Sequence, residues 1–233
     1  MTESGASSET WIHAIGLRLE PAWRREPDAS RTCDATDLIA TERETTASGI
    51  RTLTYASTGL EPDVDILLFR LAPAVDELQA AGARLLRRGL GRWLEVRHSF
   101  LGRIGSSQYV GKATSQERSV LDGDPARYLV VYPFTKSADW YLTSREARQG
   151  IMNEHMRVGR GYPAVRQLLA YSFGVDDQDF VVAYDTDDLV AFAELVRELR
   201  GTESRRSTVS DRPLLLGVHR SLEQIVADLG APA

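Results

Sequence analysis

The pattern of apolar and polar residues along the chain occurs twice, once in each half. In the first half, strands are predicted at 11–17 and 66–69, and a turn with glycine and acidic residues lies between Tyr55 and Asp65. In the second half, strands are predicted at 128–132 and 180–184, with a similar turn after Tyr171. The two halves therefore follow one plan.

Helices are predicted after these strands, because apolar residues recur at helical spacing in 75–86 and again in 189–199. A further helix follows each opening strand, another strand precedes each turn, and a short apolar segment around 94–96 or 214–216 closes each half. The resulting order, β-α-β-β-α-β in each half, is that of a ferredoxin-like unit. The predicted class is therefore α+β, with an N-terminal half at 1–122 and a C-terminal half at 123–233. Because each of these halves is much longer than a solenoid repeat, the repetition indicates domain duplication.

The composition is that of a globular protein, with 42% hydrophobic and 26% charged residues. A net charge of −5 argues against a general nucleic-acid surface, and no apolar run has the length of a membrane span. Cys33 is the one cysteine, and the first ten residues are polar, unlike a secretory signal. We expect a cytoplasmic protein without nucleic-acid or membrane partners. The segment 28–48 is compatible with a helix or with a mobile insert.

His155 is the most informative of the four histidines. Ile151, His155, Val158 and Tyr162 recur at intervals of four, three and four residues, so they share one face of a predicted helix. From spacing alone, a core histidine with a satisfied hydrogen bond is the commoner outcome, and a metal ligand is the alternative.

The order of several short motifs favours the metal ligand over the core histidine. These are Tyr132-Pro133-x-x-Lys136, Trp140-Tyr141, His155, Gly159-Arg160, Val165-Arg166-Gln167 and Gly174-x-Asp176-Asp177. Together they resemble the chlorite dismutase-like haem protein superfamily, and most closely its coproheme decarboxylase branch. The similarity covers about 127–217 and is looser over 50–112. The resemblance implies a dimeric α+β barrel of two ferredoxin-like halves with antiparallel sheets, a homopentamer, and a porphyrin in the second half.

The resemblance also implies roles for individual residues. His155 would be the iron ligand, and Glu203 would accept a hydrogen bond from its ring. Tyr132 would be the redox-active phenol, and Lys136 would pair with a propionate of the porphyrin. The remaining cofactor-binding residues expected from it are Trp140, Arg160 and Arg200, and we add Arg127.

Gln167 is the position that separates the enzymes of this superfamily. Chlorite dismutases carry an arginine there, whereas many decarboxylases carry a neutral amide, which holds a chlorine oxyanion more weakly. A shift of one residue would place Arg166 at this position, and the sequence leaves that choice open.

The leading prediction is a coproheme decarboxylase, which uses hydrogen peroxide to convert two propionates of iron coproporphyrin III to vinyl groups and yields haem b. The alternatives are a chlorite dismutase, which produces chloride and O2, and a non-enzymatic haem-binding or haem-delivery protein. A barrel without a cofactor, with His155 in its core, also remains open.

Overall fold

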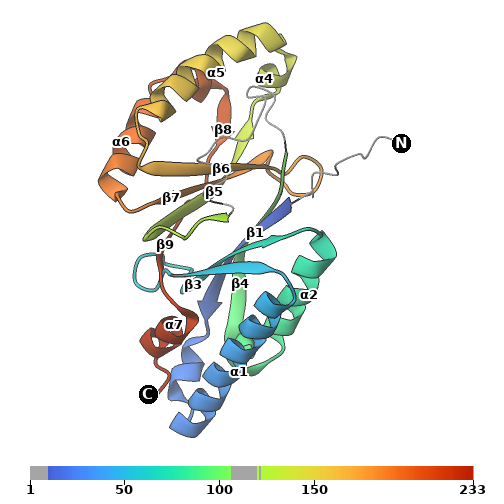
Figure 1. Cartoon of the computed structure of the whole chain (residues 1–233), viewed down its shortest axis with the longest axis vertical. Helices are drawn as coiled ribbons and strands as arrows, with labels where there is room; N and C mark the ends of the chain where they lie inside the picture. The colour runs from blue at the N-terminus through green and yellow to red at the C-terminus, as the bar shows by residue number, and fades with distance from the viewer. Residues whose placement is uncertain (1–9, 106–119, 121, 233) are drawn as a thin grey trace.

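The computed structural model describes residues 10–105, 120 and 122–232, and it consists of two ferredoxin-like halves (Figure 1). The first half contains β1 (Thr10–Leu19), α1 (Asp28–Ala47), β2 (Arg51–Ala56), β3 (Ile66–Ala72), α2 (Val75–Leu86) and β4 (Leu94–Ile104). The second contains β5 (Tyr128–Lys136), α4 (Ala138–Leu142), α5 (Arg145–Arg160), β6 (Val165–Tyr171), β7 (Phe180–Thr186), α6 (Leu189–Leu199), β8 (Thr208–Ser210) and β9 (Leu215–His219). Short 3₁₀ helices lie between some of these elements, namely η1 (Pro21–Arg25), η2 (Gly89–Trp93) and η3 (Glu203–Ser207). The last helix is α7 (Leu222–Leu229).

The strands of the described residues form one antiparallel sheet in the order β7-β6-β4-β1-β3-β2-β9-β5-β8. Strand β5 also pairs with β7, which closes the sheet into a barrel. The two seams between the halves are short, because β4 meets β6 at one residue pair and β2 meets β9 at two. The predicted α+β class, with two ferredoxin-like halves and antiparallel sheets, is confirmed.

Side chains from both halves fill the interior of the barrel. Alternate residues of each strand point inward and form one cluster, which includes Ile12, Ala14, Leu67, Phe69, Leu129, Val131, Leu168, Ala170, Val181 and Ala183. The residues between them face outward, toward the helices. Because both faces of the sheet are covered, β3, β5 and β7 are predominantly apolar, while polar side chains such as His13 and Gln167 occur on the helix-facing side.

The helices form an outer layer over each half (Figure 1). Residues 28–47 form α1, so the segment that the sequence left open is a helix. At the other end of the chain, α7 packs on the first half, where Ile225 and Leu229 join the cluster around Trp23 and Leu38. The predicted range 123–233 therefore includes a helix that covers the opposite half. Among the described residues, no helix combines the length and apolarity needed to cross a membrane.

Candidate functional site

Helix α5 carries an apolar stripe that the protein itself covers only in part. The helix begins after Ser144, whose side chain accepts a hydrogen bond from the Ala147 N–H at 3.3 Å. None of its residues is buried, whereas α6 buries Phe192 and Leu195 against the sheet. Figure 1 shows α4, α5 and α6 arching over the sheet of the second half. A half-buried apolar stripe in this position is suited to contact with a ligand.

His155 lies on this stripe as a neutral imidazole. Burial lowers the pKa of His155 to about 4, and the nearby charge of Lys136 acts in the same direction. The Nδ1 atom lies 3.1 Å from the Ser204 hydroxyl. This contact leaves Nε2 as the ring nitrogen that can bind a metal.

The hydrogen-bond partner of His155 differs from the one expected, because Glu203 points away from the ring. Within the turn of η3, Thr202 and Ser204 are buried and Glu203 is exposed. The Glu203 carboxylate pairs with Arg206 at 3.3 Å. The two neighbouring residues of a tight turn point in different directions, and the sequence contains no signal that tells which one faces inward.

Tyr132 lies on the helix-facing side of β5, in register with Val182 of β7. Its ring stacks on Tyr184 with centroids 6.0 Å apart, so the two phenols lie side by side. Burial raises the pKa of Tyr132, so its phenol stays protonated at neutral pH. Tyr184 was not predicted as a site residue, although its place in the apolar strand at 180–184 assigns it to a buried face.

The alternation along β6 separates Gln167 from Arg166. Gln167 is in register with Tyr184 and shares a face with Val165 and Leu169, which pack against the helices. Arg166 points to the opposite face, where it forms an ion pair with the buried Asp185. The side chain on the α5 side of the sheet is therefore the neutral amide.

Lys136 is held beside the helix that carries His155. Its Nζ donates to the Ser204 carbonyl at 2.9 Å and to the Thr208 hydroxyl at 3.0 Å, and it lies 4.8 Å from the centre of the buried Trp140 ring. Burial and the neighbouring Arg205 lower the pKa of Lys136 to about 8. A bound anion would offset this electrostatic cost.

The predicted arginines fall into two groups. Arg160 and Arg200 are exposed at the carboxyl ends of α5 and α6, and the charge of Arg200 acts on the phenol of Tyr132. Arg127 lies instead at the start of β5, over the ring of Tyr128, nine residues from Lys136 and thus about 30 Å along the strand. The structure does not bring Arg127 to the other predicted residues.

Arg205 is a cation of this region that the prediction left out. It pairs with Asp211 at 2.8 Å, and its charge acts on both Tyr132 and Lys136. The site thus combines a neutral imidazole, an aromatic sheet face and several cations. This set fits a flat apolar ligand that carries carboxylates and a metal with one free coordination position.

Comparisons with known proteins agree with this description. A family model described as chlorite dismutase matches residues 30–220. A coproheme decarboxylase from Mycolicibacterium smegmatis is 30% identical over 181 residues, which is 75% of each chain. A mutant chlorite dismutase from Candidatus Nitrospira defluvii superimposes with a TM-score of 0.84 at 25% identity, over 94% of each chain. The enzyme from that organism in complex with imidazole has the same TM-score at 26% identity, over 97% of this chain and 96% of that one.

Proposed function

Since this chain belongs to the chlorite dismutase family, we propose that it is a coproheme decarboxylase, which converts iron coproporphyrin III to haem b with hydrogen peroxide. The observation that carries this proposal is the pair of Tyr132 and Gln167 on the α5 side of the sheet, with Arg166 turned away. A phenol is the group that oxidative decarboxylation needs, whereas a cation at the position of Gln167 would suit chlorite.

The residues around α5 support the binding of a porphyrin. Nε2 of His155 would ligate the iron, and Ser204 would hold the ring in one orientation through Nδ1. Lys136, Arg200 and Arg205 would receive propionates, because ammonium and guanidinium groups form charge-assisted hydrogen bonds with carboxylates. The Trp140 ring would hold the Lys136 ammonium in place through a cation–π contact, since Nζ lies 4.8 Å from the centre of the ring.

Bound iron porphyrin would supply oxidising power when peroxide reaches it. Tyr132 would then give up one electron and one proton, and would take a hydrogen atom from the β-carbon of a propionate. Each propionic acid that becomes a vinyl group loses CO2, two protons and two electrons, and these reduce one peroxide to two waters. Tyr184 would keep the Tyr132 phenol in place, and Gln167 would offer peroxide a neutral hydrogen-bond donor.

The test is to load the apo-protein with iron coproporphyrin III, add a few equivalents of peroxide, and measure the porphyrin mass. Stepwise loss of two formic-acid equivalents supports the decarboxylase. Tight porphyrin binding without a change of mass would contradict it and favour a haem carrier. A protein that folds and gives no Soret band with any porphyrin would contradict haem binding as well.

Chlorite dismutase is the second candidate, because the solved chlorite dismutases named above superimpose over nearly the whole chain. Rapid O2 release from chlorite, measured with an oxygen electrode, would support it. In that case Arg166 would have to turn from Asp185 toward α5, and Arg166→Ala should abolish O2 release while the porphyrin remains bound. O2 release that is absent or slow leaves the decarboxylase as the assignment.

A further inference from the structure

Each half contains a 3₁₀ helix that packs against the longest helix of that half, η2 against α1 and η3 against α5. In the first half, the buried carboxylate of Asp34 on α1 makes this contact. It accepts hydrogen bonds from the indole N–H groups of Trp23 and Trp93 and from the guanidinium of Arg92, each at 3.1 Å. A carboxylate with three donors thus holds η2 in place.

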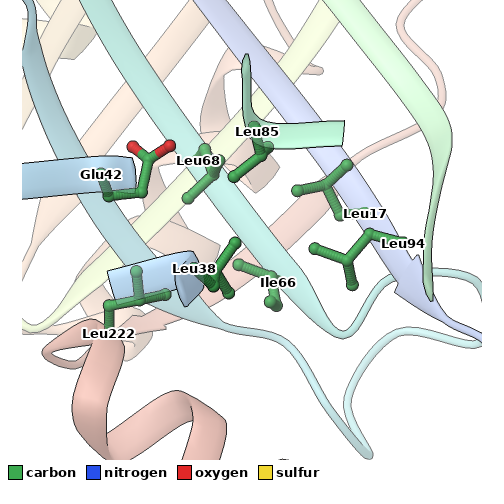
Figure 2. Close-up of a pocket in the computed structure, with 8 residues that line it drawn as sticks. All are labelled: Leu17, Leu38, Glu42, Ile66, Leu68, Leu85, Leu94 and Leu222. Carbon is green, nitrogen blue, oxygen red and sulfur yellow. The ribbon is translucent and has the colours of Figure 1, made fainter. Parts of the chain in front are cut away.

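The space under α1 is closed as well. Figure 2 shows Leu38 of α1 among apolar side chains that include Leu68 and Leu85, and this space has no room for a water molecule. By contrast, none of the residues of α5 is buried. The contact between η3 and α5 therefore lies beside the candidate site, whereas its counterpart in the first half lies beside a filled core.

The contact between η3 and α5 is made by hydroxyl groups. Nδ1 of His155 lies 3.1 Å from Oγ of Ser204, and this Oγ lies 3.0 Å from Oγ1 of Thr202. The Thr202 hydroxyl in turn donates to the Leu199 carbonyl, near the end of α6, at 2.7 Å. Thr202 and Ser204 are both buried. We call their two hydroxyl groups the hydroxyl relay.

The direction of the relay follows from its last member. The Leu199 carbonyl can only accept, so it takes the one proton of the Thr202 hydroxyl. The proton between the two hydroxyl groups then comes from Ser204, which has no second proton for the ring. Ser204 therefore accepts from Nδ1–H of His155, and the lone pair of the neutral ring is on Nε2.

The turn of η3 is fixed to α5 at two neighbouring residues. The Glu154 carboxylate accepts from the backbone N–H of Glu203 at 3.0 Å, next to the contact of His155 with Ser204. The Ser204 carbonyl also accepts from Nζ of Lys136 at 2.9 Å. One short turn thus sets the position of the imidazole and of the ammonium relative to each other.

The relay is neutral, and this affects how strongly the imidazole can donate to a metal. A carboxylate that accepts from Nδ1–H raises the basicity of a ligating histidine, and a hydroxyl group does so less. Hydrogen bonding behind the axial ligand is one of the factors that set the reduction potential of haem iron. Glu203, the carboxylate expected from the sequence, pairs with Arg206 at 3.3 Å and does not contact the ring.

We propose that the hydroxyl relay holds His155 in the tautomer that binds iron and keeps it a weaker electron donor than a histidine paired with a carboxylate. Thr202 is a positioning residue in this arrangement, since it acts on the ring through Ser204. The effect on iron rests on the proposed function, whereas the tautomer is a property of the ligand-free chain.

The first test is a long-range ¹H–¹⁵N NMR spectrum of the histidine rings in the ligand-free protein at pH 7.5, with His155 assigned by the loss of its signals in His155→Asn. We expect one tautomer, with the proton on Nδ1 and none on Nε2. A proton on Nε2, or two tautomers in similar amounts, would overturn the proposal.

The part of Thr202 is tested by a pair of variants. Thr202→Val keeps the shape and removes the hydroxyl, so that Ser204 loses its acceptor and can donate to Nδ1. We expect the Nε2–H tautomer to become populated in this variant. Thr202→Ser, the matched control, should give the parent spectrum, as should Glu203→Gln. The parent tautomer in Thr202→Val, or a changed one in Glu203→Gln, would contradict the relay.

The second test is the reduction potential of bound iron coproporphyrin III, measured by spectroelectrochemistry without peroxide. Ser204→Asp places a carboxylate behind Nδ1 and should favour ferric iron at least tenfold more than the parent does, which lowers the potential by about 59 mV or more. Ser204→Asn, the neutral control of similar size, should change the potential less. Equal potentials for Ser204→Asp and the parent would refute the electronic effect.

The two tests separate this proposal from the decarboxylase assignment. A ligand-free chain with the proton on Nε2 that still decarboxylates the porphyrin would refute the relay alone. The expected tautomer in a chain that binds porphyrin without changing its mass would support the relay and contradict the decarboxylase.

Discussion

The rings of Tyr132 and Tyr184 stack, with centroids 6.0 Å apart and an interplanar angle of 24°. Tyr184 is the more deeply buried phenol, and burial raises its pKa well above the ordinary range. Tyr132 lies on β5, and Tyr184 lies on β7 in register with Gln167 of β6. The three side chains of the candidate site therefore come from three adjacent strands.

The first prediction concerns this pair. Tyr132→Phe should keep the Soret band of bound iron coproporphyrin III and lose the change of mass after peroxide, because the phenol that transfers the hydrogen atom is gone. Tyr184→Phe should slow the reaction about tenfold, equivalent to about 1.4 kcal/mol in the barrier. Tyr128→Phe, at the opposite end of β5 beside Arg127, is the control that should react normally. Normal turnover in Tyr132→Phe would refute the proposed role.

The second prediction follows from the pKa of Lys136, which burial and Arg205 lower to about 8. The ammonium is charged below this pH and neutral above it, so attraction for propionates should fall as pH rises through 8. The affinity for metal-free coproporphyrin III, followed by its fluorescence, should therefore decline between pH 7 and 9.5. Lys136→Arg stays charged over this range and should show little decline. Equal pH profiles for the two proteins would show that Lys136 does not contact the carboxylates.

The third prediction concerns acid stability of the ligand-free protein. Burial lowers the pKa of both His13 and His155 to about 4, whereas an unfolded chain takes up these protons near pH 6.5. The free energy of unfolding should therefore be highest above pH 6.5 and fall as the pH drops toward 4. Urea unfolding at pH 7 and pH 5 measures this loss. His155→Asn should lose less between the two values, and an unchanged difference would mean that the ring is not buried in solution.

The fourth prediction tests the inward orientation of Arg166. Arg166→Ala leaves the buried Asp185 without its cation and should lower the free energy of unfolding by about 3 kcal/mol. Adding Asp185→Asn should restore part of this loss. The exposed pair of Arg18 and Asp63 is the comparison, where Arg18→Ala should cost less than about 1 kcal/mol. A negligible effect of Arg166→Ala would indicate that the side chain is free to turn toward the ligand face.

The positions of several strands and of one helix face could be predicted from the spacing of apolar residues. The apolar runs at 128–132 and 180–184 predicted β5 and β7, and the helical spacing around His155 predicted the face of α5. These are properties of neighbouring residues, and local geometry is enough to place them.

The partner of His155 could not be predicted in this way. Ser204 and Glu203 are adjacent in the chain, and only the packing of η3 against α5 turns one inward and the other toward solvent. For the same reason the predicted set of cations near Tyr132 was incomplete, because Arg205 approaches Tyr132 from a distant segment of the chain.

By itself, the sequence determined the α+β class, the repetition of one element order in the two halves, and the helix that carries His155. Hydrophobic periodicity is a local property, so it can be recognised within each segment without knowledge of the others. The tertiary structure decided that Gln167 and not Arg166 faces α5, that α7 covers the opposite half, and that Arg70 lies in register with Thr52 and His13. These features depend on the register between strands and on the packing of segments far apart in the chain, where burial and charge pairing act together.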